Sequence, residues 1–558
     1  MPKRLAVTIA GAVSLGSYEA GVLYEVLEAI HQHNNDPRTT PDTQIVIDVL
    51  TGASAGGMTA IILAQKLMYS ADEFIGPYDN PLYNTWVKRI SLGGLQQTGD
   101  DEPALHSLFS SDLIETISRE ALLARYQGAL PPRVPHSGVG ETLRVGVALT
   151  NLNGISYGYP VTPGGRFVYI DYGDQLSRQV ESATSDKPEF WEALRQAAVA
   201  CGAFPVAFRP QDLMRSAKSE KDDYPSPNLQ TWARDPQTYA YSDGGILQNQ
   251  PLGMAKNLVD LIDHHRNQES RYYLFVSPHA KDDSPNDSLH AANADYFHLI
   301  LRLISISIGQ SGFQDWITAR DVNERLSLLD DRAKGLRDGI LSPTGGIDLP
   351  SLQKTSDSIL KLFFPNGVHR APGARSDETL ADALARISDQ YHEWIHDLDR
   401  IAGAANAYTS AILAFETAAG LGAKDCMTIY GITAKDSELA GAGLEAFLGF
   451  FDQTFRDHDY DVGRSHARNV LHDDALKQTG ALGEIFYTGS PIRPIDTRLD
   501  GLKLRDVPEG DLRAFKTGMR KRLNEMLKEM WGPIWSLAAV PGSDLILDSI
   551  LDRMIAKM

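Results

Sequence analysis

The sequence predicts an α/β fold with a mainly parallel sheet flanked by helices, followed by a mostly α-helical C-terminal region. Short apolar runs rich in β-branched residues occupy residues 5–10 and 45–50, and each precedes a glycine-containing turn and a stretch with helical spacing of apolar residues. Two strand–helix units in succession imply parallel strands. Strand patterns almost disappear beyond about residue 285, so we predict an α/β domain over residues 1–285 and a mostly helical region over residues 286–558.

Composition narrows the class of protein. The chain has 558 residues, of which 42% are hydrophobic and 22% charged, as is typical of a globular protein with a large core. The net charge of −19 disfavours nucleic acid as a partner and gives no attraction to an anionic membrane. The two cysteines, Cys201 and Cys426, cannot form a disulfide framework, which favours a reducing compartment and a cytoplasmic location.

The first residues imitate a secretory signal, because Lys3 and Arg4 precede an apolar run. We interpret this run as the first strand, since cleavage would remove pieces that the later serine turn needs. No run approaches the ~18 apolar residues of a membrane span. The sequence therefore predicts neither a signal peptide nor a transmembrane segment, and peripheral contact with a membrane stays open.

The first two strand–helix units bring two loops together. The first strand leads into a loop at residues 11–16 and a helix at 17–30, and the second leads into a turn at Ser54 and a helix at 58–68. Loops at the carboxyl ends of parallel strands face the same crevice, where α/β sheets place ligands. We therefore expect the loop at 11–16 and Ser54 to be neighbours.

Ser54 lies in the pattern G-x-S-x-G, with Gly52 and Gly56 on either side. This spacing lets a strand reverse into a helix so sharply that the serine is held in a strained, exposed pose. The helix that begins near Ala55 points its unpaired N–H groups and positive dipole end at the serine. The pattern predicts a nucleophile; the alternative is a glycine-rich turn with an idle serine.

The loop between Gly11 and Gly16 suits the binding of an oxyanion. Backbone N–H groups of Gly11, Ala12 and Val13, together with that of Ala55, would stabilise the negative charge that develops when a serine attacks an ester carbonyl. Without the serine, a tight glycine turn with no ligand would be the better interpretation.

Residues 70–140 are richer in Gly, Pro and polar residues and predict an insertion over the rim of the crevice. It is either a lid or acyl-chain groove, or a plain surface insertion. Strand patterns resume at residues 143–149 and, as a hairpin, at 166–171. A helix at 190–200 then leads to an apolar corner at 204–208.

Asp243 ends a brief strand at residues 238–242 and is followed by Gly244 and Gly245. A carboxylate at the carboxyl end of a strand, with glycines that let backbone pass closely, is well placed to reach the crevice as a base. The alternative is an aspartate that makes local turn hydrogen bonds. The last clear strand of this domain is predicted at residues 271–277.

These segments, in this order, resemble those of patatin-like phospholipases over roughly residues 4–280. The resemblance implies a Ser-Asp dyad of Ser54 and Asp243 and an oxyanion hole in the glycine loop. The chain departs from the family's pattern because Ala12 and Val13 replace two glycines and Leu15 stands where a basic residue is usual.

Residues 443–464 are similar to an extension found in some bacterial patatin-related proteins. We expect the aromatic residues of this segment to form core. We also expect its charged residues Arg456, Asp459 and Arg464 to form ion pairs rather than to catalyse.

The sequence thus predicts a serine lipid acyl hydrolase of the phospholipase A or carboxylic ester hydrolase type. Two alternatives stay open: a thioesterase or small-ester hydrolase with the same dyad, and a non-catalytic lipid-binding or interaction protein on the same fold. The order Ser54, Asp243, His279 would also fit a hydrolase triad. We favour the dyad, because triad hydrolases build several strands before the serine turn and only one precedes it here.

No cofactor or metal is expected. The histidine pairs at 31 and 33 and at 264 and 265 lack a third ligand at zinc-binding spacing. The predicted partner is a lipid or another acyl ester, and no feature of the sequence specifies an oligomeric state.

Overall fold

The computed structural model describes residues 2–97, 103, 105–161, 165–224, 227–230, 232, 234–263, 271–280, 296–342, 346–368, 378–421, 427–472 and 484–531. Cys426, His264 and His265 lie outside these ranges. The chain forms two compact units. Unit 1 comprises Met1–Ala255, Ser270–Phe313 and Ile429–Met558, and unit 2 comprises Lys256–Glu269 and Gln314–Thr428.

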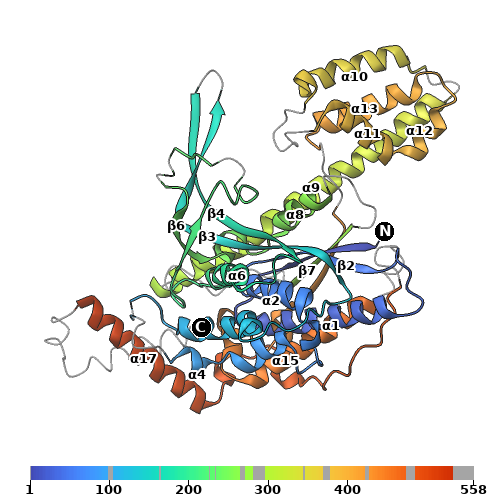
Figure 1. The fold of residues 1–558 in the computed structure, drawn as a ribbon. Helices are drawn as coiled ribbons and strands as arrows, with labels where there is room; N and C mark the ends of the chain where they lie inside the picture. The colour runs from blue at the N-terminus through green and yellow to red at the C-terminus, as the bar shows by residue number, and fades with distance from the viewer. Residues whose placement is uncertain are drawn as a thin grey trace. The chain divides into compact units, whose positions relative to one another are not determined.

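Unit 1 is built on one eight-stranded sheet with the order β5-β6-β3-β2-β1-β7-β8, in which β4 pairs with β3 (Figure 1). The strands are β1 Lys3–Ile9, β2 Ile45–Gly52, β3 Val139–Val161, β4 Gly165–Glu181, β5 Gln211–Arg215, β6 Gln237–Asp243, β7 Arg271–Ala280 and β8 Ile429–Lys435. The pairs β1–β2, β1–β7, β2–β3 and β7–β8 are parallel, while β3–β4, β3–β6 and β5–β6 are antiparallel. The predicted mainly parallel α/β fold is confirmed.

The strand register aligns the ends that carry the candidate site. Ile9 at the end of β1 pairs with Gly52 at the end of β2. Leu149 of β3 pairs with Asp243, the last residue of β6. The loop after β1, the turn after β2 and the end of β6 therefore meet at one edge of the sheet.

Helices cover this sheet, and Figure 1 shows α1, α2 and α15 on the same side of it. The helices of unit 1 with the longest described runs are α1 Gly16–Asn35, α2 Ala55–Tyr69, α5 Ser111–Leu123, α6 Pro188–Cys201, α15 Gln453–His472 and α17 Glu509–Trp531. Shorter elements are η1 Val13–Leu15, α3 Pro81–Tyr83, η3 Asn84–Arg89, α4 Leu92–Leu95, α7 Gly245–Gln248, α14 Gly443–Ala446 and η7 Leu448–Phe450. Helix α2 packs against β2 and β3, which fixes the direction in which the chain leaves Ser54.

Residues after 285 contribute to unit 1 as well as to unit 2. Strand β8 extends the sheet by pairing with β7, and α15 packs along α1. The two helices approach closely, because a Cβ on Gly21 would lie 2.0 Å from the Tyr460 carbonyl oxygen and one on Gly463 would lie 2.2 Å from that of Tyr18. The structure therefore places segments that follow residue 285 in both units, whereas the sequence predicts one boundary at that residue.

Unit 2 is helical in its described part. Helices α8 Leu252–Asp263 and α9 Tyr296–Leu341 each contribute residues to both units, and unit 2 continues with α10 Leu349–Phe363, α11 Leu380–Gln390, α12 His392–Leu398 and α13 Ala404–Ala418. Helices α11 and α12 are separate, because the chain breaks at Tyr391. A shared core includes Ile387, Tyr408 and Ile412.

Among the helices in the described ranges, none combines the length and the hydropathy needed to cross a membrane.

Candidate active site

Ser54 stands between β2 and α2 in the sharp turn that the sequence predicts. Its φ of 50° and ψ of −126° are rarely adopted by a residue other than glycine, and such conformations concentrate at functional sites. A Cβ on Gly52 would lie 2.3 Å from the backbone carbonyl of Gly56, and a Cβ on Gly56 would lie 2.3 Å from the Ala10 oxygen. Space therefore requires glycine on both sides of the serine.

The side chain of Ser54 is more enclosed than predicted, since the residue is only 7% exposed. Asp243 lies on one side of it, with Oδ2 2.6 Å from Ser54 Oγ. Gly11 lies on another, because a Cβ placed on Gly11 would be 3.1 Å from Ser54 Cβ. The expected neighbourhood of the loop at 11–16 and the serine is confirmed.

Asp243 is held at the end of β6 by contacts to both its side chain and its backbone. The Gly245 N–H donates to Oδ1 at 2.7 Å, which leaves Oδ2 for the serine hydroxyl. Thr150 Oγ1 donates to the Asp243 carbonyl oxygen at 2.7 Å. A Cβ on Gly244 would lie 2.0 Å from the Ala148 oxygen, so glycine lets β6 end against β3.

Burial sets the acidity of Asp243. Loss of solvation raises the pKa of the carboxyl group to about 7, although the hydrogen bonds from Ser54 and from the Gly245 N–H act in the opposite direction. A carboxylate with its ordinary pKa near 3.9 is a weak base toward a hydroxyl group. The buried Asp243 is therefore a stronger base than an exposed aspartate and titrates near neutral pH.

The loop after β1 offers fewer free donors than predicted. The Gly11 N–H donates to the Asn249 carbonyl oxygen at 3.0 Å, so it is not available to an oxyanion, and the prediction of Gly11 as a donor is corrected. Among the described residues, no acceptor is recorded for the N–H groups of Ala12, Val13 and Ala55. These three stay candidates for an oxyanion hole.

Val13 has a φ of 50°, a left-handed conformation that β-branched residues rarely adopt. The side chain is partly buried and packs against two hydrophobic clusters. Gly16 ends the loop against Trp86, whose ring would lie 2.6 Å from a Cβ at that position. The loop thus keeps a glycine-like backbone without a glycine at position 13, and the surrounding packing stabilises it.

Replacing Val13 with glycine is expected to keep kcat/KM for an ester within about tenfold of the wild-type value, a difference of ~1.4 kcal/mol in the barrier. Glycine adopts the left-handed conformation without strain, and the N–H group stays in place. Ester hydrolysis and the melting temperature would be measured together. A hundredfold loss in a folded variant would show that the Val13 side chain itself is needed.

Residues of the last segment of unit 1, Ile429–Met558, support the loop. Ser14 Oγ donates to the Ala446 carbonyl oxygen, and a Cβ on Gly449 would lie 2.6 Å from Ser14 Oγ. Arg456 donates to the Gly449 carbonyl oxygen at 2.8 Å and to that of Val87 at 3.0 Å. The segment at 446–456 therefore braces the loop beside Ser54.

The charged residues of α15 act largely as expected. Arg464 pairs with Glu25 at 2.9 Å, and His458 lies 3.2 Å from Asp459. Arg456 differs, because it donates to backbone carbonyls rather than to a carboxylate.

His279 lies apart from the dyad. Its ring Nδ1 is 3.5 Å from Asp436 Oδ1, and its backbone N–H donates to Ser277 Oγ. Among the described residues, no imidazole lies within hydrogen-bond distance of Ser54 or Asp243. In the same ranges, no group of three or more His, Cys, Asp or Glu side chains is arranged to hold a metal ion.

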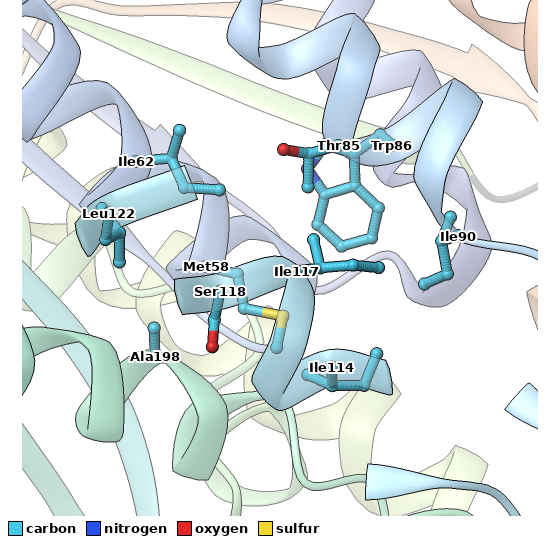
Figure 2. Close-up of a pocket in the computed structure, with 10 residues that line it drawn as sticks. All are labelled: Met58, Ile62, Thr85, Trp86, Ile90, Ile114, Ile117, Ser118, Leu122 and Ala198. Atoms are coloured by element: carbon cyan, nitrogen blue, oxygen red, sulfur yellow. The ribbon is translucent and has the colours of Figure 1, made fainter. Parts of the chain in front are cut away.

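A narrow cavity begins one helical turn beyond the serine, at Met58 of α2 (Figure 2). Its walls also come from η3, α5 and α6, and they are hydrophobic except for Thr85 and Ser118. The free volume is about 40 Å³, so an acyl chain would enter only as neighbouring side chains move aside. The insertion predicted at residues 70–140 supplies much of this wall, including Trp86 and Ile117.

Three contacts of the site were missed from the sequence. Thr150 lies directly after the strand predicted at 143–149, so the rule that locates Asp243 at a strand end also locates Thr150. Asn249 and Ala446 carry no such local signal, because each contributes a backbone carbonyl to a loop more than 200 residues away.

Residues 7–256 match the model of a family described as patatin-like phospholipase. The chain is also similar to the uncharacterized protein y4iI of Sinorhizobium fredii (strain NBRC 101917 / NGR234), with 25% identity over 319 residues that cover 44% of each chain. The uncharacterized membrane protein Rv3479 of Mycobacterium tuberculosis (strain ATCC 25618 / H37Rv) is 24% identical over 304 residues, which cover 49% of this chain and 27% of that protein. The chain therefore spans less than half the length of either relative.

Proposed function

Residues 7–256 belong to the patatin-like phospholipase family, and from this premise we propose that the protein is a serine lipid acyl hydrolase with a Ser54–Asp243 dyad. The observation that carries the proposal is the 2.6 Å contact between Ser54 Oγ and Asp243 Oδ2. A serine in a strained turn, a buried carboxylate and unpaired N–H groups meet there, as nucleophilic attack on an ester requires.

In the first half of the reaction, Ser54 Oγ attacks the ester carbonyl carbon and gives its proton to Asp243 Oδ2. The carbonyl oxygen gains the negative charge, and the N–H groups of Ala12, Val13 and Ala55 stabilise it. As the tetrahedral intermediate collapses, the carbon–oxygen bond to the alcohol breaks and the alcohol leaves with the proton from Asp243. The acyl group stays on Ser54.

In the second half, water attacks the acyl carbon and gives a proton to Asp243, which passes it to Ser54 Oγ as the acyl–enzyme bond breaks. The products are a carboxylic acid and the free enzyme. Both halves need Asp243 to be ionised when it accepts a proton, and its raised pKa makes that acceptance more favourable near neutral pH.

The cavity beside Met58 is the proposed binding place for the acyl chain. It lies on α2 one turn from the nucleophile, and its walls are hydrophobic. Each methylene that leaves water for such a place stabilises the bound substrate by about 0.8 kcal/mol, or roughly fourfold in kcat/KM. The enzyme should therefore prefer longer acyl chains until the cavity is full.

Replacing Ile114 with tryptophan is expected to lower kcat/KM for a twelve-carbon ester at least about tenfold more than for a four-carbon ester, because the indole takes up space that several methylenes would fill. The measurement is hydrolysis of a matched series of p-nitrophenyl esters. Ile75→Trp is the control, since Ile75 is 76% exposed and does not line the cavity. An equal loss for all chain lengths would contradict this placement of the acyl chain.

Release of fatty acid and lysolipid from phosphatidylcholine, compared with hydrolysis of matched short esters and thioesters, tests the proposed substrate class. Phospholipid turnover supports the lipid hydrolase. Turnover of only short esters or thioesters would favour the runner-up, and turnover of none of them would favour a non-catalytic lipid-binding protein. The cytoplasmic location stays a prediction.

A further inference from the structure

The hairpin of β3 and β4 carries a cluster of exposed hydrophobic side chains. Figure 1 shows these strands extending beyond the rest of the sheet of unit 1. Six large hydrophobic residues on the hairpin are each 43–61% exposed, and we call them the hairpin patch: Leu152, Phe167, Val168, Tyr169, Ile170 and Tyr172. Consecutive residues of a strand point to opposite faces, so the patch covers both faces of β4.

The patch is ordered by contacts within the hairpin. Tyr157 pairs with Tyr169 across the strands, and their rings stack with centroids 5.5 Å apart. Phe167 stacks on Tyr169 with centroids 6.5 Å apart. Gly154, with a φ of 75°, makes room for Ile170, whose Cγ2 would lie 2.4 Å from a Cβ at that position. The hydrophobic side chains are therefore held outward as one surface.

Charge is sparse in this stretch of the chain. Residues 152–172, which span the patch, contain two charged residues, Arg166 and Asp171, although 22% of all residues are charged and the net charge is −19. Exposed strand edges are usually protected by charged side chains. A hydrophobic projection rich in tyrosine matches the interfacial zone of a lipid layer, where the amphipathic ring of tyrosine is favoured.

The hairpin is continuous with the candidate active site. In β3, residues Leu149, Thr150 and Asn151 pair with the end of β6 that carries Asp243, and the chain enters the hairpin directly after them. A lipid surface seated on the hairpin would therefore contact the strand that pairs with β6, which carries Asp243.

We propose that the hairpin patch is an anchor that docks the protein on the surface of an uncharged lipid layer. The inference rests on the proposed lipid hydrolase for its choice of partner, but the docking itself requires no catalysis. Although the Asn228 N–H donates to the Ser156 carbonyl oxygen at 2.7 Å, a hairpin is not a closed barrel, and open strand edges are costly in hydrocarbon, so the anchor enters only the interfacial zone. Because the contact is hydrophobic, binding does not need anionic lipid.

The test uses the full chain with Ser54→Ala, so that no lipid is consumed, and phosphatidylcholine vesicles separated by flotation. We expect the protein to float with the vesicles at both low and high salt. The added substitutions Phe167→Ser and Ile170→Ser, one on each face of β4, should lower the bound fraction at least fivefold. The matched control carries Met214→Ser and Leu362→Ser, which are 70% and 77% exposed outside the patch, and should bind normally.

A second readout uses the same hairpin substitutions in a chain with Ser54 intact. Hydrolysis of a soluble short ester should stay within twofold of wild type, while hydrolysis of vesicle phosphatidylcholine should fall with binding. Failure of the unsubstituted hairpin to bind vesicles overturns the anchor, as does unchanged binding by the hairpin variant. If the hairpin substitutions convert a dimer to a monomer in light scattering while vesicle binding is unchanged, the patch binds a second copy of this chain instead. Vesicle binding without hydrolysis of any ester overturns the proposed hydrolase but not the anchor.

Discussion

Replacing Ser54 with alanine is expected to lower kcat/KM for ester hydrolysis by about 10⁴-fold or more, because the oxygen that forms the acyl–enzyme bond is removed. The fold should survive. The substitution deletes one hydroxyl group and its hydrogen bond to Asp243, which is worth about 1 kcal/mol. Without that hydrogen bond the pKa of Asp243 rises further, so the carboxyl group stays neutral and no unpaired charge is buried.

Labelling with a fluorophosphonate measures this effect directly, since the reagent forms a bond only with an activated serine. The wild-type protein should be labelled and Ser54→Ala should not, while their melting temperatures stay within a few degrees. Ser356→Ala provides a matched control, because Ser356 is a buried serine in unit 2. Persistent labelling of a folded Ser54→Ala protein would move the nucleophile elsewhere.

The parts of the site that the sequence revealed are those fixed by local backbone geometry. Gly52 and Gly56 lie in one five-residue motif. Both must be glycine, because side chains there would collide with backbone in the same turn or in the neighbouring strand. Asp243 could be placed because it ends a short strand before two glycines. The pairing of β1 with β2 then follows from the order of the strand–helix units.

The parts that the sequence did not reveal depend on contacts between distant segments. Ser14 meets Ala446 across 432 residues, and no local pattern indicates which carbonyl accepts that hydroxyl group. Strand β8 is equally hidden, since it is seven residues long and its place in the sheet comes from pairing with β7. The pKa of Asp243 depends on burial by several elements and is likewise absent from the local sequence.

Replacing Asp243 with asparagine is expected to lower kcat/KM by about 10³-fold or more, because the amide keeps the shape of the carboxyl group but cannot accept the serine proton. The amide oxygen can still accept the hydrogen bond from the Gly245 N–H. In the wild type, activity should rise with pH through about 7 and level off above it, since only the ionised carboxylate is a base. The pH profile of kcat/KM, measured with an uncharged ester, checks both statements.

The same substitution should have the opposite effect on stability. The folded-state pKa of about 7 lies above the ordinary value near 3.9, so the folded protein binds this proton more tightly than the unfolded chain does. The contribution of Asp243 to the free energy of unfolding is therefore greatest below about pH 4 and is lost as pH rises toward 7. Asp243→Asn should melt at a higher temperature than the wild type at pH 8, and the difference should shrink toward pH 5.

Together these two readouts separate a base from a structural aspartate. A residue that only supports the turn would lose stability and activity together when replaced, whereas Asp243→Asn is expected to gain stability while it loses turnover. His279→Ala completes the comparison. Because His279 faces Asp436 rather than the dyad, the activity of this variant should stay within about tenfold of the wild-type value. A thousandfold loss in folded His279→Ala, with activity retained in Asp243→Asn, would replace the dyad with a histidine-based mechanism.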